Sequence, residues 1–179
     1  FNHTGTDVTI PVSGLVGTIT SLTVAFEGSS CSNNPLSTSV GLAHAKVSDL
    51  QGTLFGPDNT SCILFNRPGT AANLGANLCQ TIFTDDPTAP LFHTTATTGL
   101  APYTGSFRPS QTLSRYNGKD PNGTWRLKLV DAASGNTGTL YTFSLRITTG
   151  AVVCDPVSGG GAGCNIADIT GIGGPPELP

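Results

Sequence analysis

The sequence predicts an all-β protein with the architecture of a jelly-roll β-sandwich. Apolar residues alternate with polar ones in several short runs, and nowhere do they recur at helical spacing over three turns. Between the runs lie segments rich in Asn, Asp, Gly and Pro, which pre-set turns or tolerate positive φ. Short alternating strands separated by such turns are typical of sandwiches and jelly rolls.

The expected strands each carry one apolar face. The alternating positions are, in chain order, Leu22, Val24 and Phe26; Leu50, Gly52 and Leu54; Trp125, Leu127 and Leu129; and Tyr141, Phe143, Leu145 and Ile147. The last run is the cleanest alternation and predicts a strand with one buried face. Pro68 and Gly75 restrict residues 66–77 to one helical turn at most. The Thr-rich segment around His93 is interpreted as a loop.

The chain divides into a domain and a tail. The alternation stops after Thr149, and the remaining residues contain the run SGGGAG and end in GGPPELP. We therefore expect a β-sandwich over residues 1–149 and a Gly/Pro-rich linker or C-terminal tail over residues 150–179. A domain of about 150 residues buries roughly 70% of the surface of its unfolded chain, which is enough for a core of its own.

Composition argues against several classes of function. Charged residues make up 11% of the chain and the formal net charge is -3, whereas roughly 25% of an ordinary domain is charged. The few Lys and Arg residues are scattered and do not form a surface that neutralises phosphates, so no nucleic-acid partner is expected. No apolar run reaches the roughly 18 residues of a membrane span.

The cysteines indicate a cellular compartment. They show no Cys-x-x-Cys spacing, which favours disulfides over a zinc site and predicts a secreted or cell-surface protein. Cys62 and Cys79 bracket a loop of about 15 residues, whose closure would stabilise the fold by roughly 3 kcal/mol. Cys154 and Cys164 bracket the Gly-rich run. We expect these two bridges, with Cys31 left to pair with another chain or segment, although the spacing alone allows other pairings.

No catalytic motif stands out. The sequence lacks a nucleophile elbow, a zinc-protease helix motif, a phosphate-binding loop and a dinucleotide fingerprint. A Ser/His/Asp triad assembles from distant positions, so residue order does not exclude one, but nothing in the order favours it. His44 lies inside an alternating run and is interpreted as a structural histidine bonded within a pair of strands. We therefore expect a chain that is not an enzyme.

Four acidic residues are candidate calcium ligands. Asp49, Asp85, Asp86 and Asp131 follow or flank expected strands, and Ca²⁺ binds carboxylate and carbonyl oxygens. The interpretation we favour is that they accept backbone N–H groups as turn caps, since the chain has no D-x-D-x-D-G loop. Because Asp85 and Asp86 are adjacent, they do not provide the two carboxylates across a cleft that glycoside hydrolysis requires.

One long stretch carries a family likeness. Residues 103–147 strongly resemble the P domain that follows the catalytic domain of kexin-like and furin-like subtilisin proteases, and the block from Asn122 to Trp125 is specific to that family. In this block Asn122 and Gly123 are expected to make a turn and Trp125 to supply a large buried area. Three upstream segments fit as well. They are similar to the family's H-x-x-x-G-D-L strand, S-P-x-G-T turn and F-x-D-D element and lie at residues 44–50, 54–60 and 83–86.

The likeness covers residues 8–148, with a few departures. Ser48, Gly56 and Asn59 replace residues that are usual in the family, and Asn136 stands where an Asp is common. Only the last change bears on a site, because it brings a neutral oxygen in place of a carboxylate and so weakens the calcium prediction.

The resemblance implies a galactose-binding-like jelly roll without catalytic residues of its own. In proteases of this kind the domain packs on the catalytic domain and affects its calcium and pH dependence. The function expected for this chain is therefore that of an accessory module, with a protein partner and with calcium as its candidate cofactor. Such a module should expose an apolar patch where its partner packs.

Two other functions stay open. The first is an extracellular adhesion or assembly protein, in which Cys31 and the tail join neighbouring subunits. The second is a carbohydrate-binding module, which rests on analogy with the fold alone. The aromatic rings that such a module would use are Tyr103, Tyr116, Trp125 and Tyr141, and of these Trp125 and Tyr141 are expected to be buried.

Overall fold

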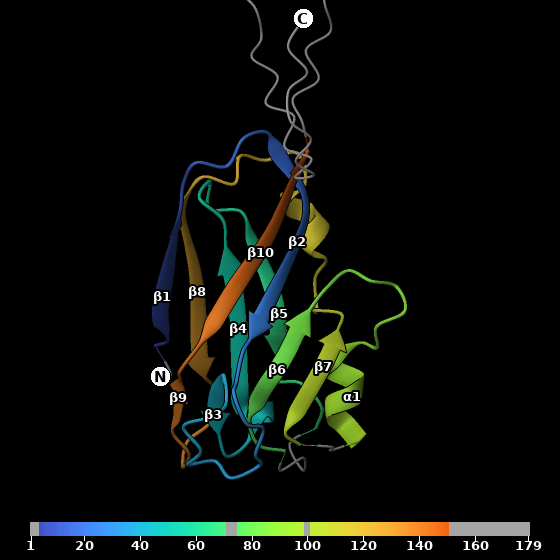
Figure 1. Cartoon of the computed structure of the whole chain (residues 1–179). Coiled ribbons are helices and arrows are strands. Elements are labelled where there is room, and N and C mark those ends of the chain that lie inside the picture. The colour runs from blue at the N-terminus through green and yellow to red at the C-terminus, as the bar shows by residue number, and fades with distance from the viewer. Residues whose placement is uncertain (1–3, 71–74, 99–100, 151–179) are drawn as a thin grey trace, which may run out of the picture.

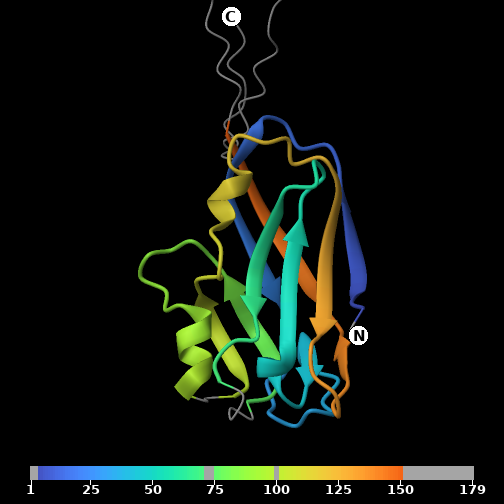
Figure 2. The same ribbon diagram turned by 180° about the vertical axis from the view of Figure 1, so that it is seen from behind.

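The computed structural model describes residues 4–70, 75–98 and 101–150, and most of the regular structure in this part of the chain is β-strand. Two sheets lie face to face with the core between them (Figures 1 and 2). The predicted all-β sandwich is therefore confirmed. Residues 151–179 lie outside the described residues, so the domain boundary near Thr149 stays a prediction.

The first sheet has four strands, all antiparallel to their neighbours. Their order is β1 (Thr6–Val12), β8 (Gly123–Asp131), β4 (Leu50–Phe55) and β5 (Ser61–Asn66). The central strand β8 carries the predicted apolar face, and Leu127 pairs with Val8 on one side and Leu54 on the other. Because side chains of paired residues point to the same face, this register directs the apolar residues of three strands into the core.

The second sheet contains the remaining strands. Their order is β10 (Phe143–Gly150), β2 (Thr18–Phe26), β6 (Leu78–Phe83), β3 (Leu42–His44) and β9 (Gly138–Leu140), and β7 (Tyr103–Phe107) pairs in parallel with β6. The topology leaves β1 at one end of the first sheet and β10 at one end of the second. These two end strands lie on the same side of the sandwich (Figure 1).

Three short helices accompany the sheets in the described ranges. They are α1 (Phe92–Thr98) and the 3-10 helices η1 (Val47–Asp49) and η2 (Leu113–Tyr116). Helix α1 occupies the Thr-rich segment that we expected to be a loop, so that prediction is wrong. Phe92 and Ala96 are four residues apart and both buried, and one helical turn brings them to the same face against the core.

Aromatic side chains fill the middle of the core. Phe92 packs edge-on against Phe83, Tyr103 and Phe107, with ring centroids 5.2 to 5.4 Å apart. In a second pair, the ring centroids of Tyr116 and Trp125 are 5.0 Å apart. Tilted and edge-to-face contacts are the arrangement that aromatic quadrupoles favour. The sandwich therefore has a core of large, interlocking rings.

Strand β10 is less buried than its alternation predicts. Phe143, Leu145 and Ile147 are only partly buried, and Tyr141, just before the strand, is 43% exposed. The expectation of a buried Tyr141 is wrong. The physical reason is the position of β10 at the end of its sheet, where the side chains that point inward have packing partners on one side only.

The disulfide differs from the predicted one. Cys31 bonds to Cys79 with an S–S distance of 2.07 Å, and Cys62 is a buried free thiol. The predicted Cys62–Cys79 bridge is wrong because β5 and β6 belong to different sheets, whereas the connection from β2 to β3 brings Cys31 to β6. Cys31 is therefore not available to join subunits. The predicted Cys154–Cys164 bridge lies outside the described residues.

Candidate functional site

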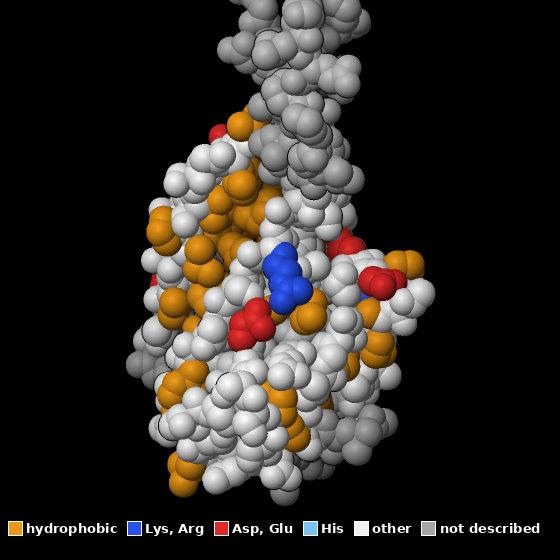
Figure 3. Space-filling view, viewed as in Figure 1, with side chains coloured by type: hydrophobic (Ala, Val, Ile, Leu, Met, Phe, Trp, Pro, Cys, Tyr) orange, Lys and Arg blue, Asp and Glu red, His pale blue; other side chains and the backbone are white. Residues whose placement is uncertain are grey.

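An apolar surface opens where the end strands β1 and β10 diverge. Figure 3 shows hydrophobic side chains gathered in the upper part of this face, without a charged side chain among them. We define the open-edge patch as the exposed or partly buried hydrophobic residues of β10, of the end of β1 and of the connection that follows β1: Val12, Leu15, Val16, Phe143, Leu145 and Ile147. The strand residues in it pack partly against the core, while Leu15 and Val16 are 36% and 44% exposed. A contiguous apolar surface of this kind is typical of a contact with a partner.

Asn122 holds one border of the patch in place. Its Oδ1 accepts the N–H of Leu15 at 3.0 Å, and its Nδ2 donates to the carbonyl of the same residue at 2.8 Å. Asp120 Oδ1 accepts from the same amide nitrogen and from the Asn122 backbone, which orients the side chain. The residue that the sequence predicted as a turn former thus also fixes the connection between β1 and β2 across the top of the patch.

Gly123 and Trp125 hold the chain next to Asn122 in place. Gly123 has φ +126, where side chains are rarely tolerated, and a Cβ there would lie 2.7 Å from Pro57 Cβ. Trp125 is fully buried, and its Nε1 donates to the carbonyl of Pro121 at 2.8 Å. Trp125 therefore fills the core and also ties the turn that precedes its strand.

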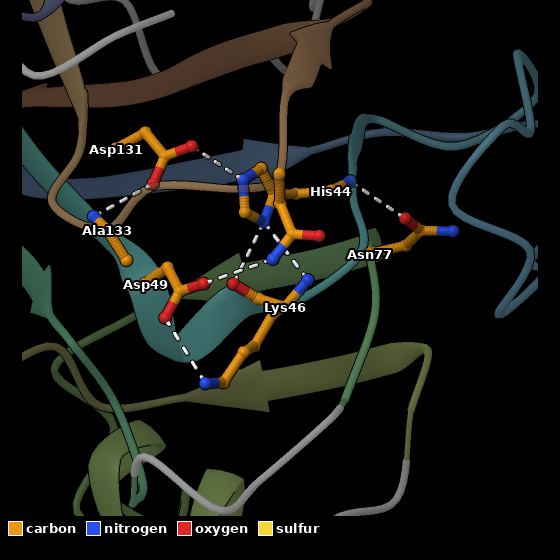
Figure 4. A network of polar contacts seen from close by, with 7 residues as sticks. His44, Lys46, Asp49, Asn77, Asp131 and Ala133 are labelled. Carbon is orange, nitrogen blue, oxygen red and sulfur yellow. Dashed lines mark hydrogen bonds and ion pairs between the residues drawn. The ribbon is translucent and has the colours of Figure 1, made fainter.

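A buried polar cluster joins the two sheets at another point (Figure 4). His44 on β3 places Nε2 3.0 Å from Oδ2 of Asp131, the last residue of β8. The Nδ1 atom of His44 accepts the N–H of Lys46 at 3.1 Å, and Asp131 Oδ1 accepts the N–H of Ala133 at 3.2 Å. With a proton on Nε2, His44 donates to the carboxylate and accepts from the backbone, so both ring nitrogens are used. His44 thus bonds across the sheets rather than within one pair of strands.

Asp49 belongs to the same cluster. Its Oδ2 accepts from Asn136 Nδ2 at 3.4 Å, and its Oδ1 lies 3.6 Å from Lys46 Nζ. Asn77 Oδ1 accepts the backbone N–H of His44 at 2.9 Å. In the described residues every buried side-chain nitrogen and oxygen has a hydrogen-bond partner. The cluster therefore satisfies its own polar groups, as a structural network must.

The four candidate calcium ligands do not meet in one place. Asp49 and Asp131 lie in the cluster around His44, whereas Asp85 and Asp86 line a pocket of about 250 Å³ beside β2 and η2. Asp85 accepts the backbone N–H groups of Leu113 and Ser114 at the start of η2. Across residues 4–70, 75–98 and 101–150 no three His, Cys, Asp or Glu side chains form a group suited to a metal ion. Calcium binding stays a prediction.

Asp86 acts as the turn cap that the sequence suggested. Its Oδ1 accepts both the N–H and the hydroxyl of Thr88, at 2.8 and 2.7 Å. These hydrogen bonds lower the pKa of the Asp86 carboxyl, because they favour its charged form. The same kind of turn surrounds Asp58, whose pKa falls to about 2 through hydrogen bonds from Lys119 and Thr60.

Few aromatic rings are available to stack on a sugar. Tyr103, Tyr116 and Trp125 are buried, and their polar atoms donate to backbone carbonyls. Of the four candidate rings only Tyr141 is exposed. One ring offers little of the stacking area that a carbohydrate site requires, so the described surface does not favour that function.

Alkaline pH is expected to destabilise the fold through Cys62. Burial raises the pKa of this thiol from 9.0 to about 12. Between these values the folded state holds the proton that the unfolded state releases, so the free energy of unfolding falls as pH rises, by up to about 1.4 kcal/mol per pH unit. Urea unfolding at about pH 8 and about pH 10.5 measures the change. The variant Cys62→Ala should show a shallower decline, and equal slopes would contradict this assignment.

The comparisons with known proteins identify the family. The sequence model of the proprotein convertase P-domain matches residues 34–147, more than half of the chain. The chain therefore belongs to the proprotein convertase P-domain family, as the resemblance implied. No curated protein matches the chain.

The solved structures that are similar to the chain include two that contain a serine protease of Aeromonas sobria. The protease alone is 17% identical, with 81% of this chain and 20% of that chain covered and a TM-score of 0.35. Its complex with the chaperone ORF2 gives 16% identity, the same coverage and a TM-score of 0.36. This chain thus spans about a fifth of the length of those chains.

No motif in the sequence directly predicts the open-edge patch. Alternation in residues 141–147 predicts which side chains point inward, but it does not show whether another strand covers them. Whether they are covered depends on the position of β10 in its sheet. That position follows from the pairing of β10 with β2, which is far from β10 along the sequence. The exposed Leu15 and Val16 lie in a short connection without any motif of their own.

Proposed function

We propose that this P domain is a non-catalytic accessory module of a secreted protein, and that its open-edge patch packs on the catalytic domain of a subtilisin-like serine protease. The patch is the observation that supports this proposal, because it joins the half-buried residues of β10 to the exposed Leu15 and Val16. Membership in the P-domain family supports the nature of the partner. The disulfide between Cys31 and Cys79 supports an oxidising, extracellular location.

The proposed effect of packing is to stabilise the catalytic domain. Leu145 and Ile147 are already fixed by the register of β10 against β2, so a partner would cover side chains that need no rearrangement. Burying an apolar side chain fully contributes about 1.5 to 3 kcal/mol. Covering several half-exposed ones would stabilise both domains, and no residue of this chain would take part in the chemistry.

The test uses the full-length polypeptide that contains this chain. We expect it to hydrolyse casein, and we expect Leu145→Asp to shorten the half-life of that activity on heating at least several-fold. Thr124→Asp places the same charge on an exposed residue of β8 and should leave the half-life unchanged. Because Leu145→Asp also affects β10, Val16→Asp in the exposed connection serves as a second patch variant. A full-length protein without proteolytic activity, or patch variants as durable as the control, would overturn the proposal.

A further inference from the structure

The connection between β2 and β3 is held unusually firmly for an exposed loop. The disulfide between Cys31 and Cys79 ties it to β6. Asn77, which is fully buried, donates from Nδ2 to the carbonyls of Ser32 and Asn34, both at 2.8 Å. Gln80 Nε2 donates to the carbonyl of Gly28 at 3.3 Å. Residues 28–40, here called the pinned loop, are thus attached to the sheet at several points.

The backbone departs from ordinary geometry just before and within β6, where it holds this loop. Asn77 has φ 66 and Gln80 has φ 50, both in the left-handed region that non-glycine residues rarely adopt. The pairing of β6 with β7 shifts its register between Leu78 and Thr81, beside these residues. Strained backbone persists where the surrounding structure over-determines it, and it often accompanies a functional element.

The pinned loop exposes an apolar tip. Leu36 is 84% exposed, far more than any other large hydrophobic residue of the described chain. It lies in a tight turn in which Leu36 N–H bonds to Asn34 Oδ1 and Ser37 N–H bonds to the carbonyl of Asn34. The loop contains no charged residue. The family match begins only at residue 34, so Cys31, half of the disulfide that fixes the loop, lies outside the matched region.

We propose that the pinned loop of one copy of this chain inserts Leu36 into the open-edge patch of a second copy. The patch is apolar, and the loop carries an apolar tip, Leu36, on an uncharged segment, so their contact leaves no charge of the loop to be desolvated. The loop lies at the lower end of the sandwich in Figures 1 and 2, whereas the patch lies in the upper part of Figure 3. One molecule therefore cannot bring its own loop to its own patch.

The geometry of this contact makes the assembly open-ended. Because loop and patch are different surfaces, each added copy leaves one free loop at one end and one free patch at the other. A fixed loop also loses little conformational freedom on binding, which favours a small contact. We expect weak association, with a Kd of roughly 0.1 mM, because one inserted tip buries less area than a stable interface. The inference does not rest on the proposed protease partner, which would compete for the same patch.

The test is sedimentation of the isolated 179-residue chain over a range of concentrations from about 10 μM to about 1 mM, spanning the expected Kd. The weight-average mass of the unaltered chain should rise past that of a dimer. Leu36→Asp removes the tip and Leu15→Asp alters the patch, so each variant alone should stay monomeric. Mixed together they should form dimers and nothing larger, since only one intact loop and one intact patch can meet. Thr124→Asp, the charge control, should assemble like the unaltered chain.

Each other outcome overturns the inference. A chain that is monomeric throughout this range has no such contact. An oligomer that survives Leu36→Asp but not Leu15→Asp is formed by two patches facing each other. A mixture of the two variants that stays monomeric shows that loop and patch do not recognise one another. Leu145→Asp, a second patch variant on β10, should behave as Leu15→Asp does. None of these results bears on casein hydrolysis by the full-length protein, so the two proposals fail separately.

Discussion

Replacing Trp125 by Ala is expected to lower the free energy of unfolding by about 3 to 5 kcal/mol. The side chain is fully buried, packs against Tyr116 at 5.0 Å and donates a hydrogen bond to the carbonyl of Pro121. Its removal leaves a large cavity and an unpaired carbonyl in the core. For a chain of this size each lost kcal/mol lowers Tm by about 2 to 4 °C, so a decrease of roughly 10 °C should be seen.

Thermal and urea unfolding of the isolated chain measure this effect. Trp125→Phe keeps a ring but loses the indole N–H, and it should cost clearly less than Trp125→Ala. Tyr141→Ala provides the matched control, because Tyr141 is an aromatic residue of the same domain that is 43% exposed. It should change stability by about 1 kcal/mol or less. A Trp125→Ala variant that unfolds like the Tyr141→Ala variant would show that Trp125 contributes little to the core.

The Trp125 region shows where sequence patterns predict structure well. Trp125, Leu127 and Leu129 alternate with polar residues, and all three are buried on β8. This strand has a neighbour on each side, so the residues that point inward are covered from every direction. The turn at Asn122 and Gly123 follows from local chemistry as well, since Gly123 adopts a positive φ. Local pattern and long-range packing agree at this strand.

The same kind of pattern fails where the answer depends on distant contacts. Tyr141 and Phe143 alternate as cleanly as the β8 residues, yet they lie at an uncovered end of the second sheet. The Cys31–Cys79 bridge spans a sequence separation of 48, and the topology rather than the spacing brings its sulfurs together. Helix α1 forms in a Thr-rich segment because Phe92 and Ala96 pack into the core. In each case tertiary packing overrides local preference.

The candidate site also contains one feature that local sequence predicts and one that depends on distant contacts. Asp86 caps the turn at Thr88, the role that the absence of a D-x-D-x-D-G loop favoured. The sequence indicated a structural role for His44 but not its partner, because Asp131 is 87 residues away along the chain. Only the meeting of β3 and β8 at one end of the sandwich creates that pair. Nearness along the sequence therefore does not identify the acid that pairs with a buried histidine.

His44→Ala is expected to lower the free energy of unfolding by about 3 to 5 kcal/mol, because it leaves the buried Asp131 carboxylate without its imidazole partner. His44 is fully buried and Asp131 is 3% exposed, with Nε2 and Oδ2 3.0 Å apart. Without the imidazole, the Asp131 carboxylate keeps the hydrogen bond from the N–H of Ala133, and a buried carboxylate with so little compensation is costly. Urea unfolding at neutral pH measures the loss.

A double-mutant cycle separates the pair from the cavity that His44→Ala also creates. If the uncompensated carboxylate dominates, His44→Ala combined with Asp131→Asn should be more stable than the sum of the two single losses predicts, because the amide carries no charge to desolvate. Lys46→Ala serves as the control in the same cluster, since Lys46 Nζ is partly exposed and lies 3.6 Å from Asp49. That variant should cost about 1 kcal/mol or less. Strictly additive losses in the cycle would mean that His44 stabilises the sandwich by filling space between its sheets, and that the hydrogen bond to Asp131 adds little.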